Sequence, residues 1–217
     1  RDGPGAGQLV KLSMDSIVDQ NPVDRMLFPE RNVKVWLPPG YSDSPDQRYP
    51  VVYIHDGQNM ITDRESWTGR SWRLGTMITE MIEEGAIRAP ILVMVNNDPG
   101  GFGFVRRRHL EYGDTPFGAR YVQFLCDELK PAIDKQYRTL NSPADTYIMG
   151  SSMGGLCSFL AFWRRRDVFG NCACLSPVFQ VPQIVDVFVN GGNLRGGGHR
   201  IYIDNGGGTT GKKGPFI

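Results

Sequence analysis

A serine flanked by glycines follows a short apolar run in this sequence. The stretch YIMGSSMGGL, residues 147–156, contains the pattern G-x-S-x-G between Gly150 and Gly154. Where a strand turns sharply into a helix, this pattern presents the central serine hydroxyl above the sheet edge, and its small neighbours avoid steric clashes. We therefore predict that Ser152 is a nucleophile, with a tight turn that has no chemical role as the alternative. Ser151 is expected to be packed or to form the turn.

A serine nucleophile needs main-chain donors that stabilise the oxyanion formed during attack on a carbonyl. The residue after the nucleophile normally supplies one amide, here Met153, at the N-terminus of the following helix. A loop after an earlier strand supplies the second amide. The stretch YIHDGQN, residues 53–59, ends such a strand. The amides of Gly57 and Gln58 are therefore candidates, with an ordinary turn at 56–57 as the alternative.

Strand and helix patterns alternate along the chain and would position these groups. Apolar residues alternate in RNVKVWL, residues 31–37, and APILVMVNND, residues 89–98, is apolar enough for burial on both faces of a parallel sheet. This alternation predicts a mostly parallel sheet with helices on both faces, in which ligands bind at the carboxyl ends of the strands. Residues 181–192 are ambiguous. Further strands are predicted at 49–57, 144–150, 170–179 and 199–207, and helices at 71–85, 119–137 and 154–166.

Two stretches depart from this regular alternation. Residues 99–118 are rich in glycine, aromatic residues and arginine, and their length predicts a functional or flexible loop. The arginine runs at 106–108 and 164–166 are expected to face solvent. Pro131 lies within the helix predicted at 119–137, where it would kink the helix or split it in two.

Composition narrows the classes of protein to consider. Hydrophobic residues make up 40% of the 217 residues and charged residues 22%, which suits a packed domain. The net charge of +1 argues against nucleic acid or an acidic membrane as a partner, and no apolar run reaches the roughly 18 residues of a membrane helix. Neither the compartment nor the oligomeric state follows from these numbers.

The cysteines indicate neither a metal site nor a disulfide framework. They show no CxxC pair and no Cys/His metal spacing, so we expect small, buried, reduced side chains, with one disulfide as the alternative. Two of them alternate on a predicted strand and should share one face. The four cysteines are Cys126, Cys157, Cys172 and Cys174.

Several motifs occur together and in a family-specific order. The stretches RNVKVWLPPGY, YPVVYIHDGQNM, LKPAIDKQYRT, YIMGSSMGGL and LSPVF resemble the esterase family of α/β-hydrolases. That family includes feruloyl and acetyl-xylan esterases, enterochelin esterases, S-formylglutathione hydrolases and mycolyltransferases. The resemblance extends from about Asn32 to Asn205. It implies the α/β-hydrolase fold, with a mostly parallel central sheet and helices on both faces, and no metal or organic cofactor.

The same resemblance implies roles for particular residues. It places the nucleophile at Ser152 and the oxyanion amides at Gln58 and Met153. It also suggests that residues 96–98 and 110–113 flank the substrate cleft.

The order of the family's triad is serine, acid, histidine, and here the pattern breaks. Asp204, at the end of the last predicted strand, is the candidate acid, with a strand-end turn residue as the alternative. None of the three histidines follows it. We expect His55 to pack or hydrogen-bond beside the oxyanion strand. His109 is expected to face solvent or pack in its loop, with a position in the cleft as the alternative. His199 should lie at the opposite, amino end of the sheet.

The family's histidine loop and closing helix have no counterpart after Asp204, where residues 206–217 show no periodicity. We therefore expect a single esterase-like domain over residues 1–217 that is C-terminally incomplete or diverges after the last strand. Without a base, the serine keeps its proton and most of the catalytic rate is lost.

Three functions are consistent with these observations. The leading hypothesis is a serine carboxylester hydrolase that forms an acyl-enzyme on Ser152. Its substrate would be a small-molecule or polysaccharide-linked ester, such as a feruloyl, acetyl or siderophore ester. The alternatives are an acyltransferase with the same nucleophile and a non-catalytic binding protein with a hydrolase fold, because no triad histidine is visible.

Overall fold

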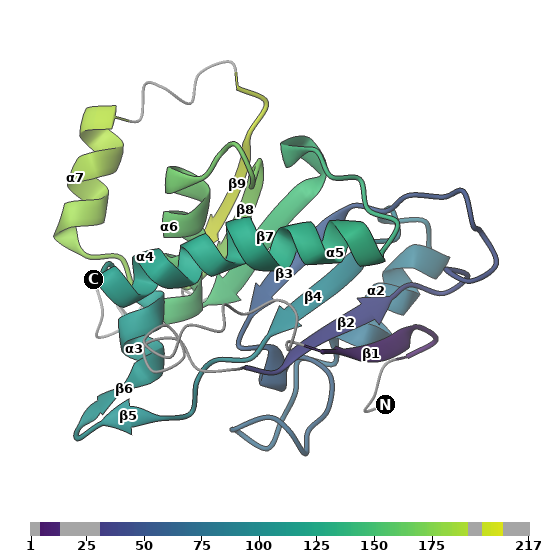
Figure 1. Cartoon of the computed structure of the whole chain (residues 1–217), viewed down its shortest axis with the longest axis horizontal. Coiled ribbons are helices and arrows are strands. Elements are labelled where there is room, and N and C mark those ends of the chain that lie inside the picture. Colours follow the sequence, from purple (N-terminus) through teal and green to yellow (C-terminus); the bar gives the residue numbers. More distant parts are fainter. Residues whose placement is uncertain (1–4, 14–30, 191–196, 206–217) are drawn as a thin grey trace, which may run out of the picture.

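The main feature of the computed structural model is a seven-stranded sheet, in the order β1-β2-β4-β3-β7-β8-β9 (Figure 1). The structure describes residues 5–13, 31–190 and 197–205. The pairs β1–β2 and β2–β4 are antiparallel and the other neighbouring pairs are parallel, which confirms the predicted mostly parallel sheet. Its strands are β1 (Gln8–Leu12), β2 (Val33–Leu37), β3 (Val51–His55), β4 (Ile91–Val95), β7 (Thr146–Ser151), β8 (Asn171–Leu175) and β9 (Arg200–Asp204).

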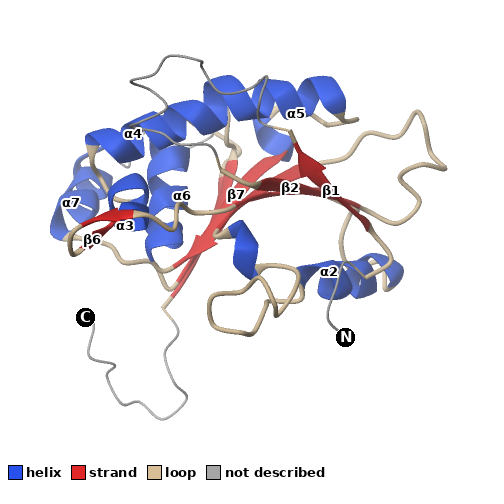
Figure 2. Ribbon diagram, turned by 60° about the horizontal axis from the view of Figure 1, so that its bottom comes forward, coloured by secondary structure: helices blue, strands red, loops and turns tan. Residues whose placement is uncertain are grey.

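Helices cover both faces of the sheet, as the alternating patterns predicted (Figure 2). Helices α4, α5 and α6 lie on one face, and α2 lies on the other. None of the helices in the described part of the chain combines the length and apolar character needed to cross a bilayer. The α-helices are α2 (Leu74–Glu83), α3 (Arg107–Tyr112), α4 (Pro116–Gln123), α5 (Lys130–Gln136), α6 (Met153–Arg164) and α7 (Val181–Asn190).

Each face of the sheet has its own apolar core. On β2, Val33 and Val35 pack with the side chains of α4, α5 and α6, whereas Trp36 packs on the α2 face. Every residue of β4 is buried, as expected for a central strand covered on both sides. The sheet is thereby fixed between two helical layers, and the turns at the carboxyl ends of its parallel strands have a rigid support.

The helix predicted at 119–137 forms, and it continues through Pro131. A π-helical segment, Phe124–Leu129, joins α4 to α5. Pro131 is at the start of α5, directly after this wider turn. Because proline lacks an N–H and clashes with the carbonyl four residues earlier, an interrupted α-helical pattern at this point is favoured. The predicted apolar stripe is buried, including Leu125 and Ile133 at 0% exposure.

Two irregular segments are more ordered than the sequence suggested. The predicted loop at 99–118 instead contains a short hairpin, β5 (Gly101–Phe102) and β6 (Val105–Arg106), followed by α3 and the start of α4. The ambiguous segment at 181–192 contains helix α7. The prediction of a plain loop was wrong because ion pairs between distant segments, described below, hold α3 in place.

The cysteine predictions are confirmed. All four cysteines are free and buried. The sulfur atoms of Cys172 and Cys174 lie 3.9 Å apart, so these two residues share one face of β8. Burial raises the pKa of the Cys126 thiol to about 12, which keeps it protonated and unreactive.

Candidate active site

Ser152 lies at the junction between β7 and α6 in a backbone conformation that side chains rarely adopt. Its φ is 58° and its ψ is −120°. The end of β8 and the segment after it fix this backbone. The Ser152 N–H donates to the Leu175 carbonyl at 2.9 Å, and the Ser152 carbonyl accepts from the Val178 N–H at 3.3 Å. A serine at a helix N-cap usually bonds to the helix amides, but the Ser152 side chain makes no such bond. The residue is exposed and lines a cleft.

The glycines on either side of Ser152 are required by close packing. A Cβ atom on Gly150 would lie 2.6 Å from the carbonyl carbon of Gly154, so the turn itself has no room for a side chain. A Cβ atom on Gly154 would lie 3.2 Å from the Cβ of His55 and 3.3 Å from a carboxylate oxygen of Asp56. The start of α6 therefore packs directly on the end of β3.

The turn after β3 is held by side chains from two other segments, helix α3 and the segment after β4. Asp56 is left-handed, with φ 56° and ψ 43°, and its N–H donates to the Tyr112 hydroxyl at 3.0 Å. The Asn97 side chain donates to the Asp56 carboxylate at 2.6 Å, and the Asn97 N–H donates to the Gln58 side chain at 3.2 Å. A Cβ atom on Gly57 would lie 2.6 Å from the backbone of β4, so this turn lies against the neighbouring strand.

Arg108 completes this support and corrects a prediction. Its Nε and Nη2 atoms donate to the two carboxylate oxygens of Asp56 at 2.8 and 2.7 Å. The run 106–108 was expected to face solvent, yet Arg107 and Arg108 turn inward and Arg106 alone is exposed. The inward orientation follows from the acidic partners of these two arginines, which sequence spacing does not reveal. In the run 164–166, Arg164 forms an exposed ion pair with Asp114, as expected for a solvent-facing residue.

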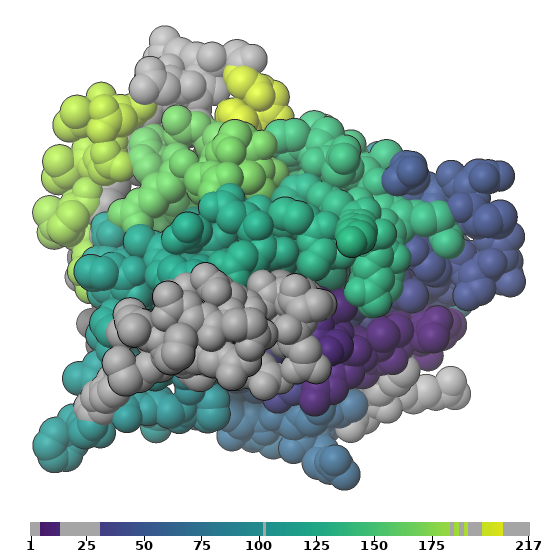
Figure 3. Space-filling model, in the orientation of Figure 1, coloured from purple at the N-terminus to yellow at the C-terminus, as the bar shows by residue number. Residues whose placement is uncertain are grey.

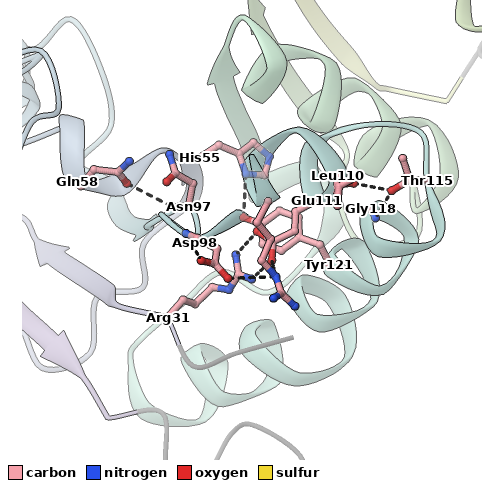
Figure 4. Close-up of polar contacts among 12 residues, drawn as sticks. Arg31, His55, Gln58, Asn97, Asp98, Leu110, Glu111, Thr115, Gly118 and Tyr121 are labelled. Atoms are coloured by element: carbon pink, nitrogen blue, oxygen red, sulfur yellow. Dashed lines mark hydrogen bonds and ion pairs between the residues drawn. The ribbon is translucent and has the colours of Figure 1, made fainter. Parts of the chain in front are cut away.

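Behind the cleft wall is a buried ionic cluster that joins segments far apart in the sequence (Figure 4). Arg31 donates to both carboxylate oxygens of Glu111, at 2.7 and 3.3 Å, and lies over the Tyr121 ring at 4.8 Å. Arg107 lies 3.1 Å from Asp98 and 3.6 Å from Glu111. Charges this deeply buried are tolerated only when paired. The cluster therefore ties α3 to β2 and to the segment after β4.

His55 packs beside the oxyanion strand, as predicted. Its Nδ1 lies 3.0 Å from the Tyr121 hydroxyl, and its ring contacts Tyr112 at 4.9 Å between centroids (Figure 4). Burial lowers the pKa of His55 to about 4, with further lowering by the Arg108 and Arg31 charges and opposition from Asp56. His55 is therefore neutral near pH 7. Burial also raises the pKa of both tyrosine hydroxyls well above the ordinary value, so they stay protonated.

The low pKa of His55 predicts a pH-dependent stability. The unfolded chain takes up a proton on this histidine below about pH 6.5, whereas the folded chain does so only near pH 4. The free energy of unfolding should therefore fall by roughly 3 kcal/mol as the pH drops through this interval. Urea unfolding at pH 7 and pH 4.5 measures it. His55→Phe should reduce the dependence of the unfolding free energy on pH, and His199→Gln should leave it as it is. An unchanged pH dependence in His55→Phe would contradict the assignment.

The cleft beside Ser152 has a volume of about 950 Å³. Gln58 from the turn after β3 lines it together with residues 96–98, as the sequence suggested for that stretch. Residues 110–113 lie behind the wall instead, where Glu111 and Tyr112 are fully buried. The cleft thus opens at the carboxyl ends of β3, β4 and β7.

The predicted oxyanion amides lie at the starts of two helical segments, and of the two residues Gln58 lines the cleft. Met153 is the first residue of α6, and Gln58 lies in the 3₁₀ turn Gly57–Asn59. N–H groups in the first turn of a helix have no partner within that helix. Both amides are therefore suited to donate hydrogen bonds to an anion.

Asp204 and the remaining histidines take different places. Asp204 ends β9 and accepts hydrogen bonds from the Ser176 N–H and hydroxyl at 2.8 and 3.2 Å. His199 contacts Phe162, far along α6 from Ser152, which confirms its place at the amino end of the sheet. His109 is exposed, as expected, and it is also among the residues that line the cleft. Within the described ranges, none of the three histidines hydrogen-bonds to Ser152 or Asp204, and no cluster suited to a metal ion is found.

Comparison with known proteins places this geometry in a family. The family model described as "Putative esterase" matches residues 26–188. The chain belongs to this esterase family. It is 30% identical over 159 residues to an endo-1,4-beta-xylanase/feruloyl esterase of Xylanibacter ruminicola, an alignment that covers 70% of this chain and 20% of that protein.

Solved structures identify the fold of this esterase-family chain. A ferulic acid esterase matches with 25% identity and a TM-score of 0.59, over 82% of this chain and 63% of that one. The enterobactin esterase of Shigella flexneri matches with 15% identity and a TM-score of 0.63, over 90% of this chain and 44% of that one. The chain thus has the predicted α/β-hydrolase fold and spans less than two thirds of each of these relatives.

Proposed function

We propose that this chain is a serine carboxylester hydrolase that forms an acyl-enzyme on Ser152. One observation carries the proposal: Ser152 is held in a strained conformation, is exposed in the cleft, and makes no capping bond with its side chain. Strain of this kind persists only where the surrounding structure imposes it, and it concentrates at functional sites. The hydrogen bonds to Leu175 and Val178 impose it here.

The proposed reaction has two steps. The Ser152 oxygen attacks the ester carbonyl carbon, and the N–H groups of Gln58 and Met153 stabilise the oxyanion. The C–O bond to the alcohol then breaks, and the alcohol leaves with the proton that the serine lost. Water attacks the acyl-serine, the acid departs and Ser152 regains its proton. Asp204 lies at the carboxyl end of β9, two strands from β7 in the sheet. We assign it as the acid that orients the base.

The substrate class comes from the relatives and the cleft. The relatives named above are feruloyl, ferulic acid and enterobactin esterases. We propose a related ester for this chain, either a small molecule or one attached to a polysaccharide. Because Ser152 is exposed, water reaches an acyl group held there, which favours hydrolysis over transfer to an alcohol.

Labelling with a fluorophosphonate probe tests the proposal. The probe should add its phosphonyl mass to the peptide that contains Ser152, because the reaction needs the same nucleophile and oxyanion donors as ester cleavage. Ser152→Ala should abolish the label. Ser151→Ala is the matched control, since Ser151 lines the same cleft, and it should label like the unaltered chain.

A non-catalytic binding protein is the second candidate. It is favoured by the lack of a hydrogen bond from any described histidine to Ser152 or Asp204. A serine without a base labels poorly. Absence of both labelling and ester hydrolysis in the unaltered chain would therefore reject the hydrolase and favour this alternative.

A further inference from the structure

Two exposed tryptophans line the cleft that contains Ser152. Trp67 is 74% exposed and Trp72 is 38% exposed, and both lie on the segment at 60–73, between the 3₁₀ turn after β3 and helix α2. This segment projects at the lower edge of the molecule in Figure 1. The space-filling view shows that it and the β5–β6 hairpin project from the same edge (Figure 3). Neither the serine nor its oxyanion donors explain two large aromatic side chains at this exposed place.

Hydrogen bonds to one residue fix the segment that carries the tryptophans. The Trp67 N–H and the Ser66 hydroxyl donate to the side-chain oxygen of Asn59, at 3.2 and 3.3 Å. The Trp72 N–H donates to the Asn59 carbonyl at 2.9 Å. Asn59 is 9% exposed and directly follows Gln58, the proposed oxyanion residue. The backbone that carries the two indoles is therefore fixed relative to the turn that contains Gln58.

A second set of bonds braces the same segment. The Ser71 N–H donates to the Asp63 carboxylate at 2.6 Å, and the Ser66 hydroxyl donates to the Arg70 carbonyl at 2.7 Å. An aromatic side chain on such a braced segment loses little conformational freedom when a ligand covers it. The arrangement is preorganised for binding.

The rest of the cleft lining determines what ligand the indoles suit. Thr68 and Arg106 are exposed in the same cleft and offer hydroxyl and guanidinium groups. Such groups bind vicinal hydroxyls, while the flat apolar face of a pyranose ring packs on an indole. An aromatic acyl group would instead be expected in an enclosed apolar pocket. Trp67 is instead open to solvent, which suits a sugar chain that extends beyond the cleft.

We propose that Trp67 and Trp72 form a carbohydrate subsite, which binds pyranose rings of the polysaccharide that carries the ester. This proposal identifies the alcohol part of the ester substrate as a polysaccharide, and it therefore rests on the proposed function. The sugar chain lies on the two indoles, and its ester-bearing unit extends toward Ser152. Recognition of the sugar is thereby separate from the chemistry at the serine.

Titration calorimetry of the full 217-residue chain with xylohexaose, which has no ester, tests the subsite directly. The unaltered chain should bind it. Trp67→Ala should weaken binding about tenfold or more, as truncation of a central aromatic anchor does, and Trp67→Phe should restore part of it. Tyr202→Thr is the control, because Tyr202 is 57% exposed but lies on β9 at an edge of the sheet. No binding by the unaltered chain, or equal binding by Trp67→Ala, would overturn the proposal.

Hydrolysis of two esters separates the subsite from the proposed function. Trp67→Ala should raise KM for a feruloylated xylo-oligosaccharide and leave KM for methyl ferulate unchanged. An equal rise for both esters would place the aromatic acyl group on Trp67 and overturn the carbohydrate assignment. If neither ester is cleaved while xylohexaose binding still depends on Trp67, the subsite stands and the hydrolase proposal fails.

Discussion

Ser152→Gly is expected to abolish ester cleavage while raising the free energy of unfolding by about 1 kcal/mol. With φ at 58° and ψ at −120°, the serine has a backbone conformation that costs about 1–3 kcal/mol for a residue with a Cβ atom. Glycine removes that cost, although its greater freedom in the unfolded chain cancels part of the gain. The serine side chain makes no capping bond that glycine would lose. Urea unfolding and hydrolysis of a feruloyl ester measure the two effects.

Two further variants separate strain from chemistry. Ser152→Ala keeps the Cβ atom, so it should lose activity without gaining stability. Ser151→Gly changes a residue of β7 and should lower stability, because glycine weakens a strand. If Ser152→Gly were no more stable than Ser152→Ala, the backbone strain would not be a measurable cost, and the observation on which the proposed function depends would lose its meaning.

A gain in stability at the cost of activity is expected only where structure is maintained for function. The two bonds that fix the Ser152 backbone come from the end of β8 and the segment after it, not from the turn itself. Gly150 and Gly154 leave the space that the turn requires. The surrounding fold therefore maintains a strained backbone at Ser152, and the result of that strain is an exposed serine hydroxyl.

The sequence predicted those parts of the site that depend on local patterns. The G-x-S-x-G pattern located Ser152 at a strand-to-helix junction because small residues and apolar periodicity are readable along the chain. The placement of His55 and the burial of Leu125 and Ile133 followed from the same kind of pattern. The sheet followed from alternating strand and helix signals, although β1 was not predicted.

The sequence did not predict what holds the site together. Arg108 lies 52 residues from Asp56, and Arg31 lies 80 residues from Glu111. Such ion pairs depend on which segments the fold brings together, and an arginine run alone looks like a solvent-facing surface. Helix α3 was missed for the same reason, since its position depends on these contacts more than on helix propensity. The signal that was present is the dense charge and aromatic content of residues 99–118.

The Arg108–Asp56 pair is expected to control the rate of ester cleavage without touching the substrate carbonyl. Arg108→Met removes two of the three side-chain donors to the Asp56 carboxylate, which is 8% exposed, and leaves a poorly solvated charge held only by Asn97, two residues before Gln58. If the turn moves, the Gln58 amide leaves the position in which we propose that it stabilises the oxyanion. Loss of one oxyanion donor costs about 100- to 1,000-fold in kcat, so a fall of about 100-fold is expected, with KM little changed.

A structural role alone would give a different result, and three controls detect it. Arg164→Met removes an exposed ion pair with Asp114 and should change neither rate nor stability by a measurable amount. Arg108→Lys keeps the charge but not the two-point geometry, so it should restore only part of kcat. The double variant Arg108→Met/Asp56→Asn should be no slower than Arg108→Met, because the charge left without a partner is gone. A fall in stability that leaves kcat of the folded fraction unchanged would show that the pair supports the fold and does not position the oxyanion turn.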